Sequence, residues 1–171
     1  TADGKVTITI SNGSDASSGY VVGTNNGVLS NVYLDTGKAS SDSYNNEIVN
    51  INYSALVQTN TGLITNCYVQ GLTRRNFTLA ETNGGIIFAS ASSVKYMPLT
   101  NSSEADPLYG LVKENSGLIS DCYSHSFGYS ANDSYKIAVY GFAEKNTGTI
   151  QNSYYYINED MKNDNDDKGC Y

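Results

Sequence analysis

The chain has 171 residues, of which 39% are apolar and only 16% are charged, and its 17 acidic and 10 basic residues give a net charge of −7. This composition excludes coiled coils and long helical bundles, which need far more Ala, Glu, Lys, Leu and Arg. An acidic chain with two arginines cannot neutralise many phosphates, so we expect no nucleic-acid partner. No run of about 18 apolar residues occurs, so we expect no insertion into a membrane.

Taken in chain order, the sequence predicts short strands separated by turns. An alternating run at 6–10 comes first, and further extended runs lie at 48–53, 77–79 and 137–140. Four gapless copies of one pattern carry Asn-x-Gly, a turn signal, between two short apolar stretches. These copies lie at 21–33, 56–68, 111–123 and 142–154, and a degenerate fifth copy, with Ser90 in place of the Asn, is placed at 86–98.

The spacing of these copies predicts the fold. The copies recur about every 30 residues, which is within the range of solenoid repeats. Each repeat supplies three short strands, and stacked repeats of this kind form a parallel β-helix with strands about 4.8 Å apart. We therefore predict an all-β protein, a short right-handed parallel β-helix of about five coils. The domain covers 1–156, with coils near 19–33, 54–68, 85–98, 110–123 and 141–154, and 157–171 form an acidic C-terminal cap.

Stacking brings equivalent residues of successive coils into columns. Two buried columns are expected, one of Leu29, Ile64, Val94, Ile119 and Ile150 and a smaller one of Val32, Cys67, Met97, Cys122 and Ser153. Side-chain amides are expected to hydrogen-bond from coil to coil in a ladder of Asn25, Asn60, Asn115 and Asn146. The positive φ of the bend is expected at Gly27, Gly62, Gly117 and Gly148. Lys113 is expected beside Glu144, and Glu114 beside Lys145.

The repeat resembles the GLUG repeat of bacterial surface proteins. Its pattern, Gly-Leu-Val-x-x-Asn-x-Gly-x-Ile-x-Asn-Cys/Ser-Tyr, is closest to the copies at 110–123 and 141–154. The sequence departs from it where the glycine after Leu-Val survives only as Gly23, and in the copy around Ser90. The resemblance implies a secreted or cell-surface β-helix, as in adhesins and the non-catalytic part of IgA-specific metallopeptidases. It carries over no catalytic residue.

Candidate ligand-binding residues are few. Four tyrosines are expected to form an aromatic ladder on the outside that either stabilises the sheet or binds sugar rings, namely Tyr33, Tyr68, Tyr123 and Tyr154. The adjacent Arg74 and Arg75 could bind an acidic sugar or a carboxylate. In the acidic tail, the candidate calcium ligands are Asp164, Asp166 and Asp167, although the glycine is not at the sixth position that a calcium loop requires. No other metal or cofactor is expected.

Catalysis is not expected. His125 is the only histidine, and no acid is arranged to orient it. Asp35 and Asp121 lie several coils apart, which does not suit a glycosidase pair. Cys67 and Cys122 are expected two coils apart, beyond disulfide reach, and therefore buried and reduced, whereas a Cys122–Cys170 bond stays open.

The sequence thus favours a non-catalytic extracellular module of a bacterial secreted or surface protein, acting as a stalk, spacer or adhesive surface. Its partners would be a host glycan or protein, or neighbouring copies or domains of the same surface protein. One alternative is a β-helix enzyme that cleaves polysaccharides, or a glycan-binding protein. Another is a self-assembling filament subunit, suggested by open solenoid ends and by the strand-like run at 6–10.

Overall fold

The computed structural model describes residues 6–9, 19–35, 53–73, 78–96, 108–128 and 139–157. Every strand pair among them is parallel. A first strand, β1 (Val6–Thr9), precedes five coils. Coils 1 to 3 consist of β2 (Gly19–Asn25), β3 (Val28–Ser30) and β4 (Val32–Asp35); β5 (Tyr53–Asn60), β6 (Leu63–Thr65) and β7 (Tyr68–Thr73); and β8 (Thr78–Asn83), β9 (Ile86–Phe88) and β10 (Ala91–Tyr96). Coils 4 and 5 consist of β11 (Leu108–Tyr109), β12 (Val112–Asn115), β13 (Leu118–Ser120) and β14 (Tyr123–Gly128); and β15 (Val139–Tyr140), β16 (Ala143–Asn146), β17 (Thr149–Gln151) and β18 (Tyr154–Ile157).

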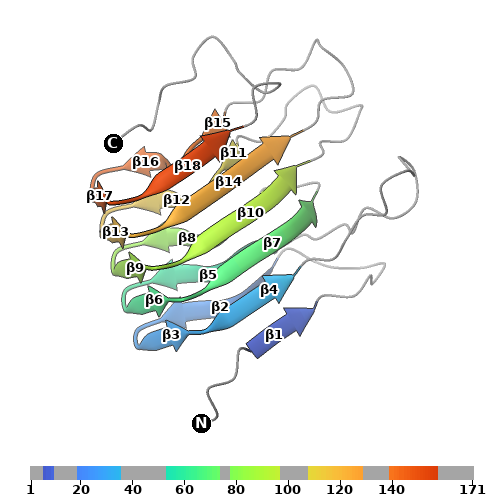
Figure 1. Ribbon diagram of the computed structural model, residues 1–171. Coiled ribbons are helices and arrows are strands. Elements are labelled where there is room, and N and C mark those ends of the chain that lie inside the picture. The colour runs from blue at the N-terminus through green and yellow to red at the C-terminus, as the bar shows by residue number, and fades with distance from the viewer. Residues whose placement is uncertain are drawn as a thin grey trace.

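Equivalent strands of successive coils form three stacked sheets (Figure 1). The front sheet has six strands in the order β1-β4-β7-β10-β14-β18. The back sheet, β2-β5-β8-β12-β16, and the short sheet, β3-β6-β9-β13-β17, have five strands each, and β11 pairs with β15. In Figure 1 the back strands run to the left and the front strands to the right while the coils rise towards the C-terminal end, so the coil is right-handed. The prediction of an all-β parallel β-helix with five coils is confirmed.

The core lies between the sheets and consists of columns of side chains. Ile64, Ile87 and Ile119 have no exposed surface, and Leu29 and Ile150 pack against the core in the two end coils. Ile87 pairs with Ile64 and with Ile119, so it occupies the place that was predicted for Val94. Val94 is buried elsewhere, on β10, one strand later in the same coil.

The third coil begins earlier than predicted. The register aligns Asn83 with Asn60 and with Asn115, so the predicted copy at 85–98, anchored on Ser90, is wrong. Ser90 instead bonds to the backbone N–H of Cys67 and takes the column position that was predicted for Met97. The predicted anchors gave steps of 35, 30, 25 and 31 residues, whereas the steps between ladder asparagines are 35, 23, 32 and 31 residues.

The asparagine ladder is continuous through all five coils. Each Nδ2 donates to Oδ1 of the asparagine in the next coil, at 2.7–2.8 Å, in the order Asn25, Asn60, Asn83, Asn115 and Asn146. The inner three members are also shielded from solvent, at 0–2% exposed. Because buried amides need partners, the ladder fixes the register of one coil on the next.

The glycine after each ladder asparagine has a different role from the one predicted. Gly71 has the only positive φ among the described glycines, whereas a Cβ on Gly62 or Gly117 would lie within 2.2 Å of a carbonyl oxygen of the coil before. Close backbone approach, rather than a left-handed conformation, therefore requires glycine here. The left-handed residues stand at the next corner, between the short and front sheets, and are Asn31, Asn66, Ala89, Asp121 and Asn152. Asn and Asp tolerate that conformation better than other side chains.

One predicted ion pair is present at the edge of the back sheet. Lys145 Nζ lies 3.8 Å from Glu114 Oε2, and the register places these residues side by side on β16 and β12. Both side chains are largely exposed, so the pair contributes at most about 1 kcal/mol and supports register more than stability.

Candidate functional site

The outer surface of the front sheet, which we call the front face, carries two parallel columns of side chains. The register of β4, β7, β10, β14 and β18 defines both columns. The aromatic column consists of Tyr33, Tyr68, Ala91, Tyr123 and Tyr154. Two residues further along each strand, the polar column consists of Asp35, Gln70, Ser93, His125 and Tyr156. All four tyrosines predicted as an aromatic ladder therefore lie on one surface.

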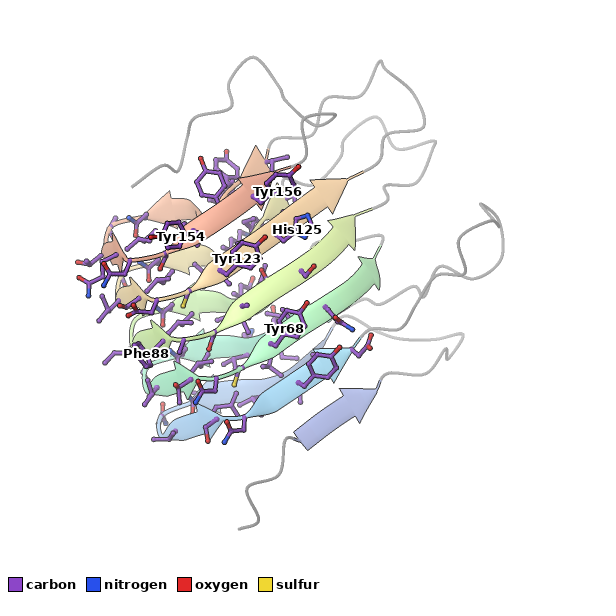
Figure 2. The ribbon with its side chains drawn as sticks, viewed as in Figure 1. Tyr68, Phe88, Tyr123, His125, Tyr154 and Tyr156 are labelled. Carbon is purple, nitrogen blue, oxygen red and sulfur yellow. The ribbon has the colours of Figure 1, made fainter. Side chains whose placement is uncertain are left out.

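Strand alternation explains why these residues face outwards. Leu34 and Val69, which lie between the two columns on β4 and β7, are completely buried. Successive side chains of a strand point to opposite sides, so their neighbours face solvent. Exposure rises towards the C-terminal coil, from 44% for Tyr123 to 75% for Tyr154. Figure 2 shows these rings on the outer side of β14 and β18.

The aromatic column is stacked at its N-terminal end. The rings of Tyr33 and Tyr68 lie 5.3 Å apart between centroids, with an interplanar angle of 30°. Partial burial raises the pKa of Tyr33, and the carboxylate of Asp35 raises it further. The Tyr33 phenol therefore remains protonated at neutral pH and can donate a hydrogen bond. Ala91 in coil 3 interrupts the column, so the predicted ladder is not continuous.

Neighbouring members of the polar column contact one another. Gln70 Nε2 donates to Asp35 Oδ2 at 2.9 Å, and Ser93 Oγ lies 3.5 Å from His125 Nδ1. The His125 ring meets Tyr156 edge-on, at 5.2 Å between centroids. Partial burial lowers the pKa of His125, so its imidazole is neutral at pH 7. The column thus offers amide, hydroxyl and imidazole groups beside a row of aromatic rings.

Comparisons with known proteins give no relative on which to base a function. No family model, curated protein or solved structure matches the chain.

The described residues do not assemble catalytic machinery at this face. Ser93 and His125 are at the outer limit of a hydrogen bond, and the carboxylate in their column, Asp35, lies three strands from His125. Asp35 and Asp121 are three coils apart, about 14 Å along the stack, which exceeds the 5–9.5 Å of glycosidase pairs. Within the described ranges, no three His, Cys, Asp or Glu residues are grouped to hold a metal ion.

A hollow of about 410 Å³ on the other side of the molecule, lined mainly by Thr and Asn residues, is a second candidate. It borders the asparagine ladder and the Glu114–Lys145 pair. Its hydroxyl groups already bond to the preceding coil, since Thr61 Oγ1 donates to Asn26 Oδ1 at 2.7 Å and Thr147 Oγ1 to Asn115 O at 3.4 Å. These groups hold coils together, so the hollow is a weaker candidate than the front face.

Several predicted residues lie outside the described ranges. These are Arg74, Arg75, Asp164, Asp166, Asp167 and Cys170. Cys67 and Cys122 are described, and both are buried free thiols with Ser90 between them in the column, as predicted from their separation by two coils. Where the structure describes the chain, no helix is long and apolar enough to cross a membrane.

Asn83 and the polar column were not predicted from the sequence. Asn83 was detectable, because 79–87 read Leu-Ala-Glu-Thr-Asn-Gly-Gly-Ile-Ile and keep the Leu, Asn, Gly and Ile of the other copies. The polar column was detectable as the second residue after each tyrosine, since alternate strand residues share a face. Its members differ in residue type from coil to coil, so self-similarity alone does not reveal them.

Proposed function

We propose that the protein is a non-catalytic binding module whose front face contacts a glycan, within a bacterial secreted or cell-surface protein. The observation that supports this proposal is the pair of columns on one sheet, aromatic rings beside hydrogen-bonding groups. Sugar rings have apolar C–H faces that pack on aromatic rings and hydroxyl rims that need polar partners. The likeness of the repeats to GLUG repeats supports the extracellular setting.

The geometry supports adhesion better than catalysis. A flat row of rings fixed by a parallel sheet can hold several units of a polymer without closing around them. Cleavage needs an acid and a base or nucleophile across one bond, and Asp35 and Asp121 lie about 14 Å apart along the stack, which is too far for that. A stalk or spacer role is compatible with the same rod, but it gives no reason for the exposed tyrosines.

A self-assembling filament is less well supported. End-to-end copies would have to continue the front and back sheets together. The front sheet has six described strands and the back sheet five. At the N-terminal end, β1 extends the front sheet beyond β4, whereas the described part of the back sheet ends at β2. The two ends of the described stack are therefore not complementary.

A glycan array tests the proposal with three proteins. The wild type is expected to bind a defined set of glycans, and the double variant Tyr154→Ala/Tyr156→Ala is expected to lose about tenfold in affinity. These side chains are 75% and 52% exposed, so their removal should leave the fold intact. Val28→Ala, an exposed apolar residue of the short sheet, is the matched control and should bind normally. Equal binding by the double variant, or no binding by the wild type, would refute the proposal.

A further inference from the structure

The interruption of the aromatic column at Ala91 creates a distinct position on the front face. Ala91 pairs with Tyr68 on β7 and with Tyr123 on β14. Strands in a sheet are about 4.8 Å apart, so the Cα atoms of the two tyrosines are about 9.6 Å apart, and only the methyl group of Ala91 lies between their side chains. Figure 2 shows Tyr68 and Tyr123 on the two strands that flank β10.

The Tyr68 ring is oriented towards this position. One of its faces is covered by Tyr33, whose ring is stacked on it at 5.3 Å and 30°. Such stacking directs the ring normal along the column, so the opposite face of Tyr68 is directed towards coil 3. There the residue is Ala91, which has no ring to cover that face.

The width of the position suits one ring and no more. A ring placed midway between Tyr68 and Tyr123 would lie about 4.8 Å from each, within the range of 4.5–7 Å for packed ring pairs. The methyl group of Ala91 would form the floor.

Polar groups border the same position. Gln70, Ser93 and His125 follow Tyr68, Ala91 and Tyr123 by two residues on their strands, and therefore face the same side. Ser93 Oγ lies near His125 Nδ1, and Gln70 is held by its bond to Asp35. None of these six residues carries a formal charge at neutral pH. A purely apolar ring would leave three polar groups facing it, whereas a pyranose can hydrogen-bond to them through its rim.

We infer that the gap over Ala91 is the primary subsite of the front face, and that it takes one neutral pyranose ring between Tyr68 and Tyr123. The hydroxyl groups of this sugar would hydrogen-bond to Gln70, Ser93 and His125. This inference rests on the proposed glycan-binding function and adds the place and the class of the sugar. The other tyrosines extend the surface for neighbouring units of the polymer.

Affinity gel electrophoresis tests the inference, with mannan, galactomannan and xyloglucan as neutral probes and polygalacturonate as the acidic one. The wild type is expected to be retarded by at least one neutral polysaccharide. Ala91→Tyr fills the gap and should weaken that retardation at least about tenfold. Ala91→Ser keeps the gap open and is the matched control, with retardation unchanged. Circular dichroism and urea unfolding verify that each variant is folded.

Tyr123→Ala keeps the test decisive if Ala91→Tyr does not fold. The Tyr123 side chain is 44% exposed and should be removable without loss of the fold, with the same drop in affinity expected. Retardation of folded Ala91→Tyr equal to the wild type would overturn the subsite while leaving the binding face in place. Retardation of the wild type only by polygalacturonate would overturn the neutral sugar. A wild type that is retarded by none of the probes and binds no glycan on the array would overturn both proposals.

Discussion

Replacing the central member of the asparagine ladder should have a much larger effect than replacing a terminal one. Asn83 is 1% exposed, accepts a bond from Asn60 Nδ2 at 2.7 Å and donates one to Asn115 Oδ1 at 2.7 Å. Asn83→Ala removes both bonds and leaves Asn115 Oδ1 without its ladder donor. Asn60 Nδ2 keeps its weaker contacts with backbone oxygens, at 3.3 Å.

The size of the effect follows from these contacts. Two buried hydrogen bonds contribute about 1 kcal/mol each, and a buried acceptor left unpaired adds about 1–2 kcal/mol. Asn83→Ala should therefore lower the free energy of unfolding by about 3 kcal/mol. Asn146, at the C-terminal end, makes one ladder bond and is partly exposed, so Asn146→Ala should cost about 1 kcal/mol.

Urea unfolding monitored by circular dichroism and tyrosine fluorescence measures both values, since the chain has 15 Tyr and no Trp. Asn83→Asp is a second variant of nearly the same shape. One of its carboxylate oxygens must face Asn115 Oδ1, so it should be destabilised at neutral pH and should recover as the carboxyl group is protonated. Equal losses for Asn83→Ala and Asn146→Ala, within about 0.5 kcal/mol, would refute the reasoning that the buried ladder holds the coils in register.

Three further predictions concern single sites. Gly117→Ala should lower the free energy of unfolding in urea by about 3 kcal/mol or more, because its Cβ would lie 2.1 Å from Gly85 O. Gly27→Ala is the matched control, with no atom near the added Cβ, and a similar loss there would contradict the explanation. Ala89 has a φ of 47°, so Ala89→Asn should raise the free energy of unfolding by about 0.5–1 kcal/mol and increase the melting temperature. A lower melting temperature would count against strain at this corner. Burial raises the pKa of Cys122 from 9.0 to about 11, so the unfolded thiol loses its proton first and stability should fall as pH rises from 9 to 11. That loss should be smaller in Cys122→Ala, and an identical pH profile would exclude Cys122 as its cause.

The stacking of the coils could be predicted from the sequence because it depends on residues that repeat. Asn25, Asn60, Asn115 and Asn146 share both residue type and spacing to a glycine, and each of them lies in the ladder. Asn83 was missed because coil 3 was anchored on Ser90, which follows Asn60 by 30 residues. The step from Asn60 to Asn83 takes only 23 residues, since the connection between coils 2 and 3 is short.

The candidate site could be predicted only in part. The tyrosines repeat and were found, but Ala91 and Ser93 depend on the register of coil 3, which was misplaced. The role of the glycines could not be predicted either. Glycine is required both where two backbones lie close together, as at Gly62 and Gly27, and where φ is positive, so the residue type does not distinguish the two cases. Both depend on contacts between coils rather than on local preference.

The unequal coil lengths have an evolutionary consequence. Successive ladder asparagines are separated by as few as 23 and as many as 35 residues, yet their amide contacts differ by only 0.1 Å. We therefore expect insertions and deletions between coils to leave the stack undisturbed. A lineage can diversify the connecting segments while the scaffold is inherited unchanged, and a foreign peptide grafted between coils 2 and 3 should be displayed without loss of the fold.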